Sequence, residues 1–187
     1  MRPIEIITDG SYVKGTIGVG CVRANFQENG ELDDFKADSY VLKLQQQSHY
    51  GSQAAEAEAV IFALDSLNEE GYTGDVIIYY DLIDLVKYIN GHENRVDDSI
   101  QSVFDELDNC ISRHSSVQSM HPKHADHIPQ FLCAIAHNAS AMGAGAKKRE
   151  KTTPHYTGKY ASHINTKDRD TKQRKAKRSS RSVARPS

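Results

Sequence analysis

Residues 4–11 read Ile-Glu-Ile-Ile-Thr-Asp-Gly-Ser, and this stretch decides the fold. Its apolar residues predict a strand that ends at Asp9. Two more carboxylates stand at comparable positions: Glu56 begins a helical apolar pattern, and Asp81 follows the apolar strand pattern of residues 76–80. Carboxylates at strand ends and at a helix start, brought to one sheet edge, form an oxygen-rich site for divalent cations. The three together predict a metal site suited to phosphoryl chemistry.

Each carboxylate also has a purely structural explanation. Asp9 and Gly10 are ordinary turn residues after a strand. Glu56 in a first helical turn would complement the helix dipole. Asp81 is of a type and in a position that favour an N-cap. The combination of the three, and their order along the chain, favour the functional interpretation.

The same residues resemble a known family. Residues 4–20, with Asp9-Gly10-Ser11 and a series of glycines, resemble the first hairpin of the ribonuclease HI family. Residues 55–64 are similar to its first helix, and residues 76–81 to its fourth strand, which ends in the third catalytic Asp. The resemblance extends from about Pro3 to about Gly145. It implies an endonuclease that hydrolyses the RNA strand of RNA–DNA hybrids.

The resemblance also implies roles for the carboxylates. Asp9 would bridge two divalent ions, Mg²⁺ or Mn²⁺, and Glu56 and Asp81 would each hold one. Selectivity for RNA requires contacts to the 2′-hydroxyl, for which Glu56 and the backbone near Gly10 and Ser11 are the candidates. Low sequence specificity is expected, because such contacts reach only sugar and phosphate.

The chain departs from the family at the fourth ligand. The family closes its site with a helical Asp, and the corresponding stretch, residues 133–140, has His137 at that position. Imidazole suits Mn²⁺ better than Mg²⁺, so a preference for Mn²⁺ is expected if His137 is a ligand. Otherwise His137 is only a polar residue on an apolar helix, and the site has decayed. If the site is active without His137, the fourth ligand must be sought elsewhere, with Asp126 first.

A loop histidine is a second element of the resemblance. Residues 120–127 contain His121, His124 and His127, and the pattern x-Pro-x-His resembles the loop of retroviral relatives and indicates His124. Such a histidine would help to activate water or release product by proton transfer near neutral pH. A zinc site made of the three histidines is disfavoured, because no Cys pair stands nearby to complete four ligands.

Alternating strand and helix patterns predict a three-layer α/β fold of the ribonuclease H-like type, a five-stranded mixed sheet with helices on both faces. A turn is expected around residues 29–34. Residues 1–145 form the predicted catalytic domain. The five predicted strands are residues 4–8, 18–25, 39–44, 76–80 and 116–120.

Charge is divided unevenly along the chain. Residues 146–187 hold 14 Lys and Arg against three Asp and Glu, whereas the whole chain has a net charge of -2. Without apolar periodicity, this basic C-terminal tail is expected to be disordered in isolation. It is predicted to bind the phosphate backbone, or else only to add solubility. The candidate phosphate-binding residues are Lys172, Arg174, Lys175, Lys177 and Arg178.

The tail would compensate for a missing element. Many ribonucleases HI carry a basic, Trp-containing protrusion after the third catalytic Asp. Here residues 90–98 form a short acidic connector, and the chain contains no Trp.

The remaining composition fits a cytoplasmic, monomeric enzyme. The sequence has no run of about 18 apolar residues that would span a membrane. Residues 1–3 lead directly into a strand, so no signal peptide is expected. Cys21, Cys110 and Cys133 are expected to be reduced. Two other functions stay open: a catalytically silent module that binds nucleic acid, and another nuclease on the same fold, such as a junction resolvase or an exonuclease.

Overall fold

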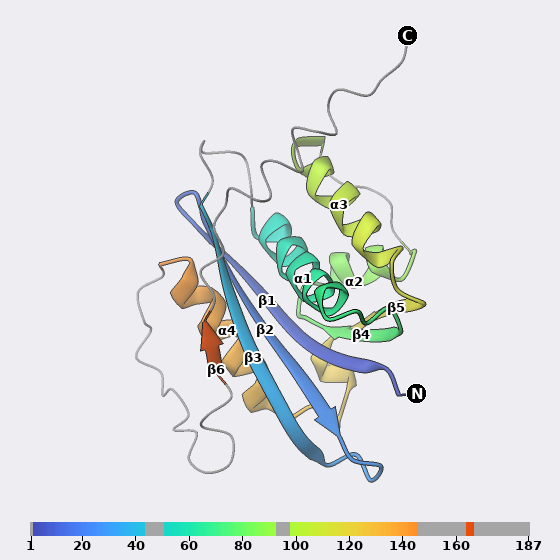
Figure 1. Cartoon of the computed structure of the whole chain (residues 1–187). Coiled ribbons are helices and arrows are strands. Elements are labelled where there is room, and N and C mark those ends of the chain that lie inside the picture. Colours follow the sequence, from blue (N-terminus) through green and yellow to red (C-terminus); the bar gives the residue numbers. More distant parts are fainter. Residues whose placement is uncertain (1, 44–50, 93–97, 146–163, 167–187) are drawn as a thin grey trace.

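The computed structural model describes residues 2–43, 51–92, 98–145 and 164–166. These residues form one mixed sheet with the strand order β5-β4-β1-β2-β3-β6 (Figure 1). Strands β1, β2 and β3 are antiparallel, while β4 runs parallel to β1, β5 to β4 and β6 to β3. The strands are β1 (Ile4–Val13), β2 (Thr16–Phe26), β3 (Leu32–Lys43), β4 (Asp75–Tyr79), β5 (Ser116–Met120) and β6 (Ile164–Thr166). The helices are α1 (Ser52–Glu69), α2 (Ile83–Ile89), α3 (Gln101–Ile111) and α4 (Gln130–Gly143), with short 3-10 turns η1 (Asp98–Ile100) and η2 (Pro122–His124).

Helices cover both faces of the sheet, as the sequence predicted. Figure 1 shows α1, α2 and α3 on one side and α4 on the other. Successive residues of β1 point to opposite faces, so Ile6 belongs to the core beneath α1 and α3, and Ile7 to the core beneath α4. Two apolar layers therefore hold the sheet between the helices, and the three-layer fold is confirmed.

The first hairpin is longer than predicted. β1 continues to Val13, so Asp9 lies within the strand, opposite Gly20 on β2, and is not a turn residue. The chain reverses at Lys14 and Gly15, whose φ values of 45° and 82° suit a tight two-residue hairpin turn. Strand pairing explains the extension, because β1 continues to pair with β2 beyond the apolar run that the sequence shows.

The second turn is shorter than predicted. β3 begins at Leu32, so Asp33 and Asp34 lie in a strand, and the turn is confined to the residues around Gly30, which has a φ of 83°. Backbone pairing with β2, in which Asp34 lies opposite Asn25, outweighs the low strand propensity of aspartate.

A sixth strand adds to the five that the sequence predicted. β6 belongs to the basic tail and pairs with the edge strand β3, with Ala37 opposite Ile164 and Ser39 opposite Thr166. Such a pairing rests on backbone hydrogen bonds and needs no pattern of apolar side chains. The sequence therefore contains no signal for this strand. The predicted phosphate-binding residues of the tail, from Lys172 to Arg178, lie outside the described residues. Within the described part of the chain, no helix combines the length and the apolar character needed to cross a membrane.

Candidate active site

Glycines allow the two flanking helices to lie directly on the sheet. A Cβ atom at Gly10 would lie 2.1 Å from the carbonyl oxygen of Ala55, so only glycine lets α1 approach β1 so closely. The close approach places Glu56 over the strand, where the Gly10 N–H donates a hydrogen bond of 3.1 Å to Glu56 Oε2. On the other face, a Cβ at Gly20 would lie 2.0 Å from the carbonyl oxygen of Ala136 on α4.

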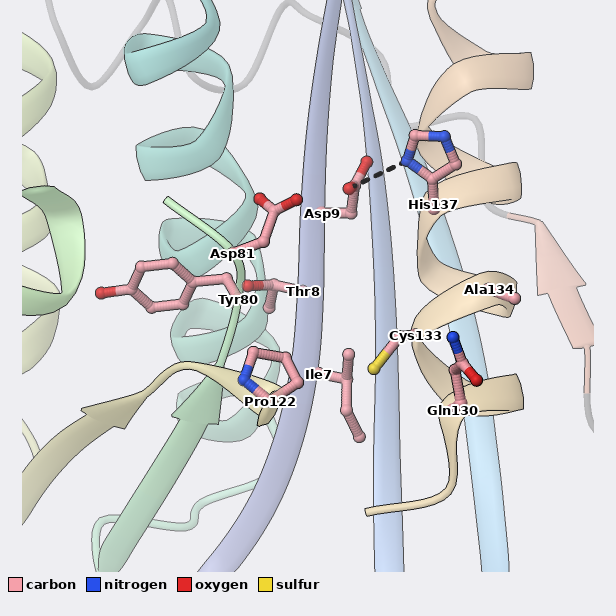
Figure 2. A pocket seen from close by; sticks show the side chains of 10 residues that line it. All are labelled: Ile7, Thr8, Asp9, Tyr80, Asp81, Pro122, Gln130, Cys133, Ala134 and His137. Carbon is pink, nitrogen blue, oxygen red and sulfur yellow. Dashed lines mark hydrogen bonds and ion pairs between the residues drawn. The ribbon is translucent and has the colours of Figure 1, made fainter. Parts of the chain in front are cut away.

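Asp9 is the centre of the site. Helix α4, seated on β2, brings His137 Nδ1 to 3.2 Å from Asp9 Oδ1 (Figure 2). The Ser140 hydroxyl donates a hydrogen bond to the other oxygen, Asp9 Oδ2. The structure therefore joins Asp9 and His137, which are 128 positions apart in the sequence.

Asp81 lies two residues after the end of β4 and is exposed. The N-cap of α2 is Leu82, not Asp81, so the capping role that the residue type suggested is not realised. Asp81 instead lines a hollow of about 260 Å³ at the carboxyl end of β4, together with Asp9 and His137. In Figure 2 Asp9 stands between Asp81 and His137. The hollow is lined by Ile7, Thr8, Asp9, Tyr80, Asp81, Pro122, Gln130, Cys133, Ala134 and His137.

Electrostatics tie Glu56 to the other two carboxylates. Burial, followed by repulsion from Asp9 and then from Asp81, raises the pKa of Glu56 to about 9, and the hydrogen bond from the Gly10 N–H offsets only part of this. Glu56 is 7% exposed and is not among the residues that line the hollow. Its charge is suppressed unless a cation neutralises the cluster.

These residues fit a divalent cation by the chemistry of their donors. Three carboxylates that repel one another supply hard oxygen ligands, and His137 adds an imidazole nitrogen. Among the described residues, no three His, Cys, Asp or Glu side chains are already gathered as a metal cluster. Both oxygens of Asp9 carry hydrogen bonds, one from Ser140 and one with His137.

The structure separates the three loop histidines. His124 ends η2 and is exposed, with its ring 5.9 Å from that of His121. Neither lines the hollow, although their neighbour Pro122 does. His127 is held elsewhere, because its Nε2 lies 2.7 Å from Oε2 of Glu5, which also accepts a hydrogen bond of 2.7 Å from the Tyr79 hydroxyl.

Sequence reasoning did not identify Ser140 or Cys133 as site residues. Ser140 lies three positions after His137 and Cys133 four positions before it, so helical spacing places all three on one face of α4. Burial, with contributions from the charges of Asp81 and Asp9, raises the pKa of the Cys133 thiol. The backbone near Ser11 stays a predicted substrate contact, while the Ser11 side-chain oxygen lies 3.0 Å from Ser140 Oγ.

Comparison with known proteins identifies the family. A sequence model of the family described as reverse transcriptase-like matches residues 33–126, half of the chain. The chain belongs to this reverse transcriptase-like family. The matched residues of this reverse transcriptase-like chain include Glu56 and Asp81, whereas Asp9 and His137 lie outside the match. No curated protein matches the chain by sequence.

Solved structures place the reverse transcriptase-like chain in the ribonuclease H-like fold. The ribonuclease H1 of Halobacterium salinarum has a TM-score of 0.56 at 14% identity, over 78% of this chain and all of its own. LC11 ribonuclease H1, solved with an RNA/DNA hybrid, has a TM-score of 0.56 at 20% identity, over 74% of this chain and 94% of its own. The protease–reverse transcriptase of prototype foamy virus has a TM-score of 0.55 at 20% identity, over 75% of this chain and 20% of its own. The ribonuclease H-like resemblance of the sequence is thereby confirmed.

Proposed function

We propose that this protein is a metal-dependent nuclease that hydrolyses the RNA strand of RNA–DNA hybrids. The observation that carries the proposal is the grouping of Asp9, Asp81 and His137 around one hollow. Beside them the buried Glu56 is held by the Gly10 N–H, and Asp9 and Asp81 lie near enough to disfavour its charge. Keeping a buried carboxylate ionised beside two other carboxylates costs free energy, and a bound divalent cation would offset this cost. The fold is that of ribonuclease H1, and the LC11 ribonuclease H1 structure contains an RNA/DNA hybrid.

Each residue of the cluster has a distinct role in the proposal. Asp9 would contact both ions, Glu56 and Asp81 one each, and His137 would be the fourth ligand. When bound, two divalent ions lower the pKa of the attacking water and stabilise the leaving 3′ oxygen. The Gly10 N–H orients Glu56 through its 3.1 Å hydrogen bond, and that carboxylate would contact the 2′-hydroxyl of the RNA strand.

Two further elements act outside the cluster. His124, exposed on the loop whose Pro122 lines the hollow, would transfer protons during water activation or product release. The basic tail would bind phosphates and offset the negative charge of the domain that precedes it.

Cleavage of a labelled RNA–DNA hybrid, measured with Mg²⁺ and Mn²⁺ in parallel, tests the proposal. The wild type should cleave the RNA strand and prefer Mn²⁺, because one of its ligands is a nitrogen. His137→Asp should restore the use of Mg²⁺, and His137→Ala should lose activity with either ion. His92→Ala, at an exposed histidine that does not line the hollow, is the matched control and should keep full activity.

Two results would contradict the proposal in different ways. Full activity of His137→Ala would remove His137 from the ligand set and make Asp126 the next candidate. A wild type that cleaves no hybrid with either ion would refute the nuclease assignment.

One observation favours a second function, a silent nucleic-acid-binding module. The hydrogen bonds of Ser140 and His137 to Asp9 give both carboxylate oxygens a partner within the protein. This alternative predicts that the hybrid binds but stays intact in the same assay, with either ion.

A further inference from the structure

A chain of hydroxyl groups ends on Asp9. Ser11 Oγ lies 3.0 Å from Ser140 Oγ, and the Ser140 hydroxyl is hydrogen-bonded to Asp9 Oδ2. Asp9 and Ser11 are two positions apart on β1 and therefore face the same side of the sheet, where α4 packs. Ser140 is fully buried, so water does not compete for its hydrogen bond.

The donor and acceptor in each of these hydrogen bonds follow from the single proton that each hydroxyl group carries. The Ser140 hydroxyl has one proton and three acceptors in reach: Asp9 Oδ2, the carbonyl oxygen of His137 at 2.9 Å and Ser11 Oγ at 3.0 Å. A carboxylate is the strongest acceptor, because hydrogen bonds to charged groups are about twice as strong as neutral ones. Ser140 therefore donates to Asp9, and Ser11 donates to Ser140. Each bond polarises the next and strengthens the hold on the carboxylate.

Close packing makes this arrangement available. A Cβ atom at Gly18 would lie 1.9 Å from the carbonyl oxygen of Ser140, so the glycine allows α4 to bring Ser140 down onto β1 and β2. Ser140 thus reaches Asp9 from below the helix while His137, one turn earlier, reaches the other carboxylate oxygen.

We propose that Ser140 is a positioning residue for the metal ligand Asp9. Its hydrogen bond fixes the Asp9 carboxylate and leaves the remaining lone pairs of that group free to bind a cation. Hydrogen-bond partners of this kind orient metal ligands, and losing one weakens metal affinity by about 10–100-fold. The inference rests on the proposed function, since it assumes that Asp9 binds metal.

A merely structural role makes a different prediction. Many helical serines bond to a backbone carbonyl of the preceding turn, and Ser66 does so on α1, with its hydroxyl 2.8 Å from the carbonyl oxygen of Phe62. If Ser140 served only its 2.9 Å contact with the His137 carbonyl, its removal would change stability and leave metal affinity unchanged.

Titration calorimetry of Mn²⁺ into the full chain, free of nucleic acid, separates these roles. Ser140→Ala should weaken Mn²⁺ affinity by about 10-fold or more. Ser140→Cys, which keeps the volume but donates weakly, should behave in the same way. Ser11→Ala should have a smaller effect, because the direct bond to Asp9 survives. The matched control Ser66→Ala should bind Mn²⁺ like the wild type. Urea unfolding in the presence of chelator checks that each variant folds.

Each outcome decides the matter. Wild-type affinity in either folded Ser140 variant, or the absence of Mn²⁺ binding by the wild type, would overturn the positioning role. If neither Ser140 variant folded, Ser140 would be structural and the proposal would also fall. Loss of Mn²⁺ affinity in Ser140→Ala, together with a wild type that cleaves no hybrid, would refute the nuclease function and leave the positioning role standing.

Discussion

Replacing Glu56 by glutamine should stabilise the metal-free protein at neutral pH while it abolishes hybrid cleavage. Burial and the neighbouring Asp9 and Asp81 raise the pKa of Glu56 from its ordinary value of 4.5 to about 9. At pH 7 the folded protein therefore keeps a proton on this carboxyl that the unfolded chain has lost. Because the unfolded state binds fewer protons, the free energy of unfolding falls as pH rises between these two pKa values.

The magnitude follows from the same two values. Each pH unit between them lowers the free energy of unfolding by about 1.4 kcal/mol, so the stabilisation from neutral Glu56 is complete below pH 4.5 and lost as pH rises through about 9. From pH 4.5 to pH 7 the loss amounts to about 3 kcal/mol. Glutamine resembles the neutral carboxyl and has no proton to lose, so the variant should avoid this loss.

Urea unfolding followed by circular dichroism, at pH 5, 6, 7 and 8 with chelator, measures the effect. The difference in unfolding free energy between Glu56→Gln and the wild type should grow with pH, since all other titrating groups cancel. Adding Mn²⁺ should reduce the difference, because a bound cation stabilises the wild type with Glu56 ionised. Ser66→Ala on the same helix removes no titrating group and is the control, and its difference from the wild type should not depend on pH.

A pH-independent difference, or a variant less stable than the wild type at pH 8, would refute this reasoning. Either result would mean that Glu56 is ionised in the folded protein without a metal. The electrostatic argument for a cation site would then be lost.

Three further predictions concern the remaining parts of the site. Asp9→Asn should reduce cleavage to background and keep the fold, as seen by activity assay and circular dichroism; near-normal cleavage would place the site elsewhere. Gly20→Ala should destabilise the protein by about 1–3 kcal/mol in urea unfolding, because α4 must move; unchanged stability would show that α4 does not need the close approach. Truncation after Gly145 should weaken hybrid affinity and flatten its salt dependence in binding titrations, with turnover retained; an unchanged salt slope would exclude the tail from binding.

The amino-acid sequence by itself determined the local features of this protein. Strand β5 has the predicted bounds, and Asp81 follows β4 as expected. Apolar periodicity reveals such elements because it records which side of each element is buried. The resemblance to ribonuclease HI also follows from short motifs, in which Asp9, Glu56 and Asp81 keep the order of that family.

Only the tertiary structure decided how far the first hairpin extends and which groups meet at Asp9. Pairing with β2 extends β1 past Asp9 to Val13. The energy of this pairing depends on the partner strand and not on the residues of β1. The approach of α4, allowed by Gly18 and Gly20, selects Ser140 and His137 as the partners of Asp9. The raised pKa of Glu56 likewise depends on burial and on two carboxylates from other elements. The sequence pattern gives neither the distances between these carboxylates nor the burial of Glu56.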